Sequence, residues 1–245
     1  MNILLIGATS VIAQETARCF AKDSASFFLV ARSKEKLEIV AADLRARGAR
    51  RVEISVLDLD HPSEYKAMIE SAYSAFPVFD VVLMAHGLLT QQQEASEDPE
   101  KTMACMFTNA TSVMALVAHL LPRLKQAKEG TLGVISSVAG DRGRATLYTY
   151  SAAKAALTVF LQGVRGELLP FGVNVLTIKP GYVDTRMVAH VQKSFLFASP
   201  VRVGQTIYEA LKAKKNGEMY TPWFWWWIMT PLNLLPEWLF LRLPI

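Results

Sequence analysis

Short apolar runs alternate with longer segments of helical periodicity along the chain. The short runs are rich in Val, Ile and Leu without polar alternation, which is typical of strands buried on both faces of a parallel sheet. The predicted strands are Ile3–Ile6, Phe27–Val30, Val52–Val56, Val81–Met84, Leu132–Ile135 and Val173–Ile178. Between them the pattern predicts helices near Ile12–Ala21, Lys34–Arg47, Ser63–Ala75, Lys101–Leu124 and Ala152–Leu169. Glycines expected to end helices are Gly48, Gly130 and Gly172.

The repeated strand–helix order predicts the fold class. It favours an α/β protein with a doubly wound, Rossmann-like parallel sheet and right-handed crossovers. No linker, repeat or low-complexity segment interrupts residues 1–220, so we expect a single domain there. Residues 221–245 form an apolar, Trp-rich C-terminal extension.

Composition changes this picture only slightly. Of the 245 residues, 51% are hydrophobic and 20% charged, so the chain can build a sizeable core. The 26 basic and 22 acidic side chains give a net charge of +4, too small to indicate a nucleic-acid partner. Cys19 and Cys105 lie in apolar stretches without metal-ligand spacing, so we expect buried reduced thiols and no metal. The apolar start lacks the basic region of a signal peptide, which favours a cytoplasmic protein.

The turn after the first predicted strand is a candidate phosphate site. A strand, a glycine turn and a helix N-terminus together present free backbone N–H groups to an anion. The segment reads Gly7-Ala8-Thr9-Ser10-Val11-Ile12-Ala13. It holds a single glycine, and such turns also favour glycine for backbone reasons alone, so both interpretations stay open.

The end of the second predicted strand bears on the choice of cofactor. An acidic residue there accepts hydrogen bonds from a ribose 2′-hydroxyl, whereas a basic residue favours a 2′-phosphate. Here Arg32 and Ser33 follow Ala31, which favours NADP(H) over NAD(H). The alternative is that Arg32 is a solvated neighbour of a helix N-cap.

Tyr150 and Lys154 carry the strongest catalytic signal. Residues four apart lie on one helix face, so the phenol and the ammonium project the same way. A phenol has a pKa of about 10, and a neighbouring positive charge is expected to bring this pKa nearer the working range. Lys154 can also hold ribose hydroxyls.

Two further polar residues complete the candidate site. Ser137 follows a predicted strand at the edge where doubly wound folds bind ligands, so its hydroxyl can orient a carbonyl. The alternative is an ordinary turn serine beside Ser136. Asn109 lies within a long predicted helix, where it either distorts the helix and holds a water that links Lys154 to solvent, or is surface-exposed.

With these residues in place, the sequence resembles the short-chain dehydrogenase/reductase family. The resemblance covers roughly residues 1 to 220. It rests on an ordered set of motifs: Gly7-Ala8-Thr9-Ser10, Asp58-Leu59, Gly87, Asn109, Ser137, Tyr150-x-x-x-Lys154, Pro180-Gly181 and Thr185. It implies a catalytic tetrad of Asn109, Ser137, Tyr150 and Lys154. It also implies that Asp58 contacts the adenine amino group and that Pro180 through Thr185 hold the nicotinamide carboxamide.

The resemblance and the motifs together give a full set of candidate cofactor residues. They are Gly7, Thr9, Ser10, Val11, Ile12, Arg32, Ser33, Asp58, Leu59, Ala85, His86, Gly87, Asn109, Tyr150, Lys154, Pro180, Gly181, Val183 and Thr185. Val11 and Ala13 stand where the family has glycines, which could crowd a pyrophosphate. Met84-Ala85-His86-Gly87 replaces a more polar family stretch, so we expect His86 to be structural or to face the adenosine rather than to act as a base.

The C-terminal extension narrows the resemblance. It resembles the branch of decaprenylphosphoryl-2-keto-ribose reductases, which reduce a 2-keto sugar on a polyprenyl phosphate beside a flavin-dependent oxidase. The stretch from Met219 to Pro236 contains no charged residue and includes a block of aromatic residues. Three roles are open for this block: contact with the inner face of the cytoplasmic membrane, a lid over the site, or a dimer interface. Prolines at 222, 231 and 236 argue against a spanning helix.

The sequence thus predicts an NAD(P)-dependent oxidoreductase that reduces a ketone or oxidises a secondary alcohol. The substrate is a small-molecule or lipid-linked carbonyl or alcohol, and the family resemblance implies a homodimer or homotetramer. The alternative from another class is a catalytically silent, dinucleotide-binding membrane scaffold, which Val11, Ala13 and the altered Met84–Gly87 stretch motivate. The intact tetrad favours the enzyme.

Overall fold

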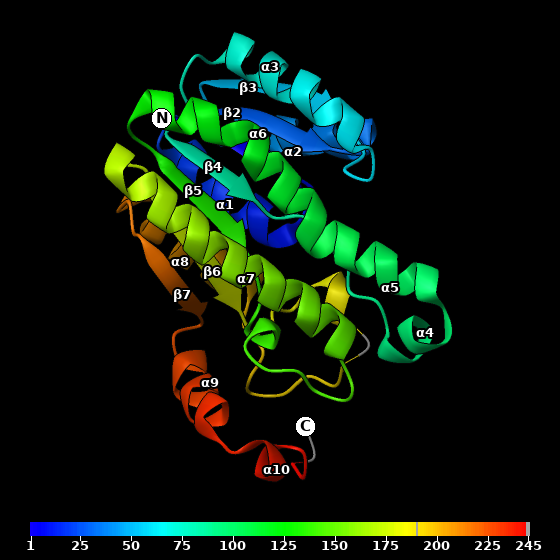
Figure 1. The fold of residues 1–245 in the computed structure, drawn as a ribbon. Coiled ribbons are helices and arrows are strands. Elements are labelled where there is room, and N and C mark those ends of the chain that lie inside the picture. Colours follow the sequence, from blue (N-terminus) through cyan, green and yellow to red (C-terminus); the bar gives the residue numbers. More distant parts are fainter. Residues whose placement is uncertain (190, 244–245) are drawn as a thin grey trace.

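A computed structural model describes residues 1–189 and 191–243. Its centre is a parallel sheet of seven strands in the order β3-β2-β1-β4-β5-β6-β7 (Figure 1). The strands are β1 Asn2–Ile6, β2 Ser26–Ala31, β3 Arg51–Val56, β4 Val81–Met84, β5 Thr131–Ile135, β6 Asn174–Pro180 and β7 Gly217–Thr221. The α/β doubly wound fold class is confirmed, and every predicted strand is present. The edge strand β7 escaped prediction because it is short and half-exposed and lacks an apolar run.

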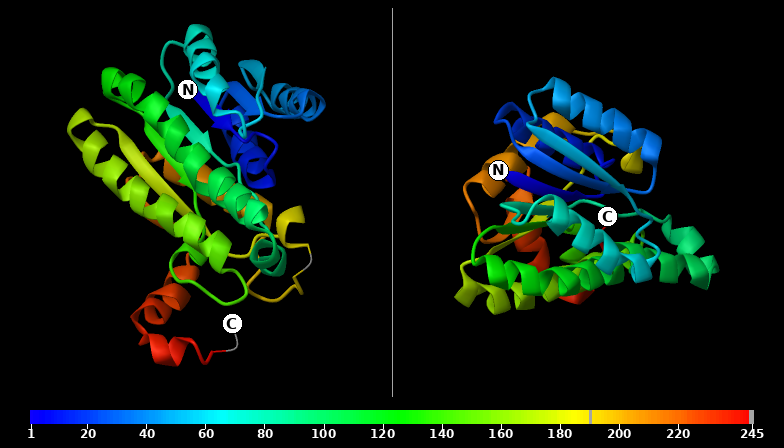
Figure 2. Two further views of the ribbon diagram at one scale, coloured as in Figure 1. Left: turned by 45° about the vertical axis from the view of Figure 1, so that its right-hand side comes forward. Right: turned by 90° about the horizontal axis from the view of Figure 1, so that it is seen from above.

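Helices cover both faces of this sheet, as the view from above in Figure 2 shows. One face carries α1 Val11–Lys22, α2 Lys34–Ala46 and α8 Pro200–Lys212. The other carries α3 Tyr65–Ala75, α6 Ser112–Ala127 and α7 Tyr148–Leu168. Shorter helices are α4 Gln92–Glu97, α5 Pro99–Met106, α9 Trp225–Leu234 and α10 Glu237–Phe240. Each face of the sheet therefore has its own buried apolar core, and the strands read as continuous apolar runs because both faces are covered.

The last crossover differs in hand from the two before it. The steps from β4 to β5, β5 to β6 and β6 to β7 all run in one direction across the sheet. The helices α6 and α7 make the first two crossovers on one face, whereas α8 makes the third on the face of α1. The expectation of right-handed crossovers is therefore wrong for β6–α8–β7. The chain changes faces between the end of β6 and the start of α8, and β6 ends at the carboxyl edge of the sheet, where ligands bind in this fold.

The long predicted helix is interrupted. The chain from Pro99 to Ala127 is helical throughout, but residues Phe107–Thr111 form a π-helical turn between α5 and α6. Within residues 1–189 and 191–243 this is the one helix long and apolar enough to cross a membrane, and 44% of its most apolar stretch is buried in the protein. Its contacts with the sheet are those of a core helix.

Candidate active site

The four candidate catalytic residues meet at the carboxyl edge of the sheet. Tyr150 and Lys154 lie on successive turns of α7, Ser137 directly follows β5, and Asn109 lies in the π-helical turn. The Lys154 Nζ atom lies 5.8 Å from the centre of the Tyr150 ring. A Cβ on Gly87 would lie 2.9 Å from Asn109 Oδ1 and 3.6 Å from Lys154 Nζ. The Asn109 and Lys154 side chains therefore both lie close to the Gly87 main chain.

The π-helical turn fixes Asn109. Its Nδ2 donates to the main-chain oxygens of Leu88, at 2.7 Å, and Cys105, at 2.9 Å, and its Oδ1 accepts from Leu88 N at 3.1 Å. Asn109 is 0% exposed, so the predicted helix distortion is present and the surface-exposed alternative is wrong. Single π turns occur often at functional sites.

Ser136 and Ser137 have different surroundings. The Ser136 hydroxyl is buried between Lys154 O, at 3.2 Å, and Thr158 Oγ1, at 2.9 Å, so it joins β5 to α7. The Ser137 hydroxyl is half-exposed and accepts from Ala139 N at 3.1 Å, which caps a short 3₁₀ turn, Val138–Gly140. Of the two serines, Ser137 is the one that can reach a substrate.

Burial dominates the acid–base properties of the tyrosine and the lysine. It raises the pKa of the Tyr150 phenol to about 12, and a hydrogen bond with Ser137 opposes that rise. Burial also lowers the pKa of the Lys154 ammonium to about 8. In the chain alone the phenol pKa therefore moves away from the working range rather than toward it, because burial is the largest cause of its shift. A phenol that stays protonated at neutral pH is suited to donate a proton.

The first turn has the geometry of a phosphate cradle. Gly7 adopts φ +81°, and a Cβ there would lie 2.5 Å from His86 N, so only glycine fits between the turns after β1 and β4. The helix α1 begins at Val11, after Thr9 and Ser10, with no acidic residue in its first turn and no cap bond from Ser10. Its free N–H groups fit an anion. Ala13 is packed in the core, whereas Val11 is exposed at the start of α1 beside half-buried Ile12.

The residues expected to face the adenosine surround the ends of β2 and β3. Arg32 is exposed and precedes Ser33, the N-cap residue of α2. This position is compatible with both roles considered for Arg32, a solvated neighbour of the N-cap and a ligand of a 2′-phosphate. Asp58 is half-buried and accepts from Asp60 N at 3.2 Å, while Leu59 is buried.

His86 lies between this region and the tetrad. Burial lowers the pKa of the His86 imidazole to about 3, and the Lys154 charge acts in the same direction. Its Nε2 lies 3.0 Å from Ser112 Oγ, and its buried Nδ1 has no hydrogen-bond partner within the described chain. An imidazole with so low a pKa is a weak base, which supports the prediction that His86 does not act as one. Ala85 beside it donates from its N atom to Ile6 O at 2.8 Å.

The segment after β6 crosses the site as the chain changes faces. Buried Val183 forms an isolated parallel bridge with Ala198, and Thr185 begins a short 3₁₀ turn. Pro180 ends β6, and Gly181 N donates to Thr221 O at 3.1 Å. Pro180 through Thr185 therefore lie at and just after the carboxyl end of β6, the strand next to β5, which Ser137 follows.

Sequence reasoning missed the residues by which the tail contacts this segment. Trp225 is 5% exposed, and its indole occupies the space that a Cβ on Gly181 would need. It packs with Val138, the residue after Ser137, and with Met229. The five tryptophans were visible in the sequence, but the one that turns inward depends on the path of the chain after β7.

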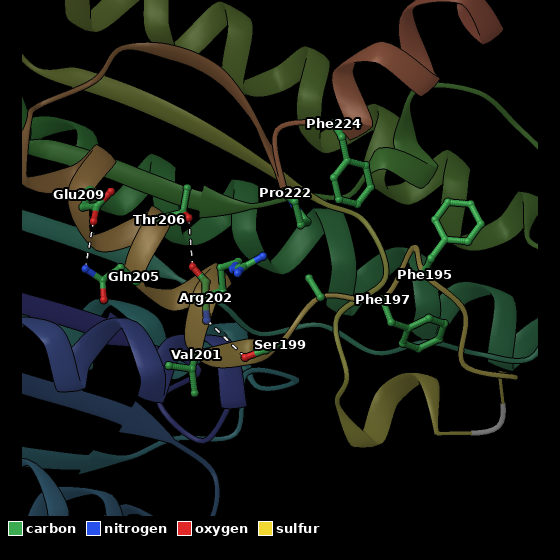
Figure 3. Close-up of a pocket in the computed structure, with 11 residues that line it drawn as sticks. Phe195, Phe197, Ser199, Val201, Arg202, Gln205, Thr206, Glu209, Pro222 and Phe224 are labelled. Carbon is green, nitrogen blue, oxygen red and sulfur yellow. Dashed lines mark hydrogen bonds between the residues drawn. The ribbon is translucent and has the colours of Figure 1, made fainter.

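A groove lined by both aromatic and polar residues lies beside the tail, with a volume of about 580 Å³. Figure 3 shows the exposed face of α8 on one side and aromatic residues on the other. The groove contains no tetrad residue. Phe197 on its wall stacks on Tyr182 at 5.2 Å between ring centres, and Tyr182 contacts Trp225, so aromatic side chains connect the groove to the Gly181 turn.

Comparison with known proteins decides the family. Residues 1–194 match the family described as short chain dehydrogenase, which is well over half of the chain. The chain belongs to the short-chain dehydrogenase family. Its fold binds a nicotinamide dinucleotide, and this short-chain dehydrogenase is an NAD(P)-dependent oxidoreductase that acts on a CH–OH or C=O group. The geometry of the Gly7 turn fits that cofactor.

Individual relatives agree with this assignment. A protein of Mycobacterium tuberculosis named as an uncharacterized oxidoreductase is 32% identical over 242 residues, 99% of this chain and 96% of the relative. A Nostoc protein named as a ketoacyl reductase is 29% identical and covers 87% of this chain and 76% of its own length. Among solved structures, an actinorhodin polyketide ketoreductase variant with NADPH shares the fold, with TM-score 0.79 and 22% identity over 89% of this chain and 94% of that one.

Proposed function

We propose that this short-chain dehydrogenase uses NADPH to reduce a ketone, with Asn109, Ser137, Tyr150 and Lys154 as its catalytic residues. The observation that carries the proposal is their convergence at the carboxyl edge of the sheet, beside the Gly7 turn and the 181–199 segment. The proposal is supported by relatives named as a ketoacyl reductase and a polyketide ketoreductase, names that denote ketone reduction.

Each residue has a role that its surroundings support. When bound, a reduced nicotinamide would supply the hydride that the carbonyl carbon accepts. The half-exposed Ser137 hydroxyl donates a hydrogen bond to the carbonyl oxygen and orients it. Tyr150 is protonated at neutral pH and transfers its hydroxyl proton to that oxygen as negative charge develops there. Lys154 neutralises the phenolate that results and holds the ribose hydroxyls.

Asn109 has a positioning role in this scheme. Its amide keeps the π turn, the Leu88 main chain and Gly87 together, directly beside Lys154 Nζ. A water held there can return a proton from solvent to Tyr150 by way of Lys154.

We propose NADPH rather than NADH because Arg32 is exposed at the end of β2, where a 2′-phosphate would lie. The remaining candidate cofactor residues surround the same edge of the sheet, from the Gly7 turn to Thr185. Reduction of a panel of ketones, followed by the absorbance of NADPH, tests the activity directly. Oxidation of NADPH with at least one ketone supports the proposal, and its absence with every ketone, together with intact NADPH binding, favours the silent scaffold.

For the substrate, we propose a ketone on a lipid carrier, such as a 2-keto sugar on a polyprenyl phosphate. The groove beside the tail supports this class, because Phe195, Phe197 and Phe224 line it and Arg202 stands at its wall (Figure 3). An isoprenoid chain suits the aromatic wall, and a phosphate suits the guanidinium. A flavin-dependent oxidase that makes the ketone is the functional partner that this substrate implies.

Two assembly proposals rest on exposed apolar surface. The tail presents Trp223, Trp227 and Trp238, each more than 60% exposed, which supports peripheral contact of a cytoplasmic protein with the inner face of the membrane. On α7, Val159 is 65% exposed, which supports a homodimer or homotetramer formed through the long helices.

A further inference from the structure

The segment of residues 138–147 joins two of the proposed catalytic residues. Ser137 precedes it, and α7 with Tyr150 follows it. A shift of this segment would change the distance between the hydroxyl that orients the carbonyl and the phenol that protonates it. What holds the segment in place therefore bears on catalysis.

Asp141 attaches the segment to the sheet. Its Oδ1 accepts from Lys179 Nζ at 2.7 Å, and its Oδ2 accepts from the Tyr220 hydroxyl at 2.7 Å. Lys179 also pairs with Glu218 at 2.5 Å. The side chains of Lys179 and Asp141 are only 5% and 4% exposed, so this is a buried pair with its hydrogen bonds satisfied. Lys179 immediately precedes the Pro180-Gly181 turn.

The next residue, Arg142, attaches the segment to the C-terminal tail. Its Nη1 donates to Leu232 O and, at 2.7 Å, to Leu235 O. These oxygens lie at the C-terminal end of α9, where carbonyl groups lack helical partners and a positive charge is favoured. The guanidinium also lies 4.0 Å from the centre of the Phe240 ring in α10.

Trp225 makes a second connection between the tail and the site. It packs against Val138 at the start of the segment and fills the space beside Gly181. The tail therefore contacts both the segment after Ser137 and the turn proposed to hold the nicotinamide. Figure 1 shows α9 and α10 beyond the carboxyl ends of β6 and β7, next to these loops.

We propose that the C-terminal tail is a positioning element of the active site, and that Arg142 and Trp225 are its positioning residues. Through them the tail fixes segment 138–147 and the Gly181 turn relative to each other. This inference rests on the proposed function, in which Ser137 and Tyr150 act on one carbonyl. The buried Trp225 then serves catalysis, whereas the exposed Trp223 and Trp227 remain free for other contacts.

Hydrogen exchange measured by mass spectrometry on the full-length chain tests the proposal without any substrate. In Arg142→Met, amide exchange in residues 138–147 should rise by about tenfold or more, the size expected for losing a hydrogen bond from a charged group. Trp225→Ala should also raise this exchange by about tenfold or more, because it removes the packing of the indole against Val138. Peptides from β1 and β4 should stay protected, which shows that the fold persists. Arg142→Lys should restore part of the protection, because an ammonium can still donate to one carbonyl.

Trp227→Ala is the matched control, since Trp227 lies on the same helix but is 64% exposed. It should exchange like the wild type. Exchange in residues 138–147 that is unchanged in both Arg142→Met and Trp225→Ala would overturn the proposal, as would an equal rise in Trp227→Ala.

Kinetics with NADPH and diacetyl, a small activated diketone, separate this inference from the proposed function. For Arg142→Met and Trp225→Ala, kcat/KM for diacetyl should fall by about tenfold. In Arg142→Met, which does not touch the Gly181 turn, the Kd for NADPH should change by less than about twofold. If kcat/KM for diacetyl stays at the wild-type value in both variants, the tail has no positioning role. If the wild type binds NADPH but reduces neither diacetyl nor any other ketone, the proposed function fails, and the exchange measurements alone decide whether the tail holds the segment.

Discussion

The Lys154 ammonium donates a hydrogen bond to the main-chain oxygen of Ile135, 3.1 Å away, while lying 5.8 Å from the centre of the Tyr150 ring. The lysine is therefore held against the end of β5, the strand that Ser137 follows. This contact fixes the ammonium between the phenol and the sheet edge, where its charge can act on both the tyrosine and a bound ribose.

The pH dependence of ketone reduction should report on Lys154. Its folded-state pKa of about 8 lies below the ordinary lysine value, so in the free protein the side chain is charged below about pH 8 and loses its charge above it. Since the charged form is the active one, kcat/KM for NADPH should be flat below this pH and fall as pH rises through it.

Lys154→Met should lower kcat/KM by about 100-fold or more and remove that descending limb, because no titrating ammonium remains. Steady-state rates from pH 6 to pH 10 measure both effects. A limb near pH 8 that persists in Lys154→Met would assign the titration to another group.

Asn109→Ala should destabilise the fold as well as the site. It removes a buried amide that pairs with both the N–H and the carbonyl of Leu88, and leaves these groups without their partner. The expected loss is about 1–3 kcal/mol in the free energy of unfolding, measured by urea denaturation. Thr111→Ala is a suitable control, because Thr111 lies in the same π turn but is exposed. Equal stability losses in the two variants would contradict a special role for the Asn109 amide.

Arg32 should determine cofactor preference. Removing a cation that binds a 2′-phosphate costs about 1.5–3 kcal/mol, so Arg32→Ser should weaken NADPH binding by about 10- to 150-fold and leave NADH binding nearly unchanged. Nicotinamide fluorescence titrations measure both affinities. Lys34→Ser, an exposed cation two residues away, serves as the control. Equal losses for NADPH and NADH in Arg32→Ser would show that Arg32 does not recognise the phosphate.

The outward face of the tail should bind lipid. Vesicles that contain anionic phosphatidylglycerol should retain the wild-type protein in flotation, and Trp223→Ser with Trp227→Ser should reduce this binding by about tenfold. The two substitutions should leave diacetyl reduction unchanged, because both side chains are exposed and outside the proposed catalytic set. Flotation of the double variant at the wild-type level would place any membrane contact elsewhere.

Much of the fold and the site could be predicted because local patterns carry them. Buried parallel strands are continuous apolar runs, so the first six strands were visible, and the spacing of Tyr150 and Lys154 alone puts both on one helix face. Amphipathic α8 was missed although Ser199 and Pro200 mark its start and Val203, Ile207, Ala210 and Leu211 form a buried stripe. That signal was present in the sequence.

Other features depend on tertiary structure and leave no local signal. The raised pKa of Tyr150 comes from burial, which the spacing to Lys154 does not reveal. The inward turn of Trp225 follows from the space beside Gly181, and the hand of the last crossover follows from the packing of α8 on α1. These are relations between segments far apart in the chain.

Tyr150→Phe tests the central claim most directly, since it removes one oxygen and leaves the buried ring in place. NADPH oxidation with the best ketone of the panel and NADPH binding by fluorescence are measured on the same preparation. Turnover should fall by about 1,000-fold or more while the Kd for NADPH stays within about threefold of the wild type. Turnover within about tenfold of the wild type would contradict the assignment of Tyr150 as the proton donor.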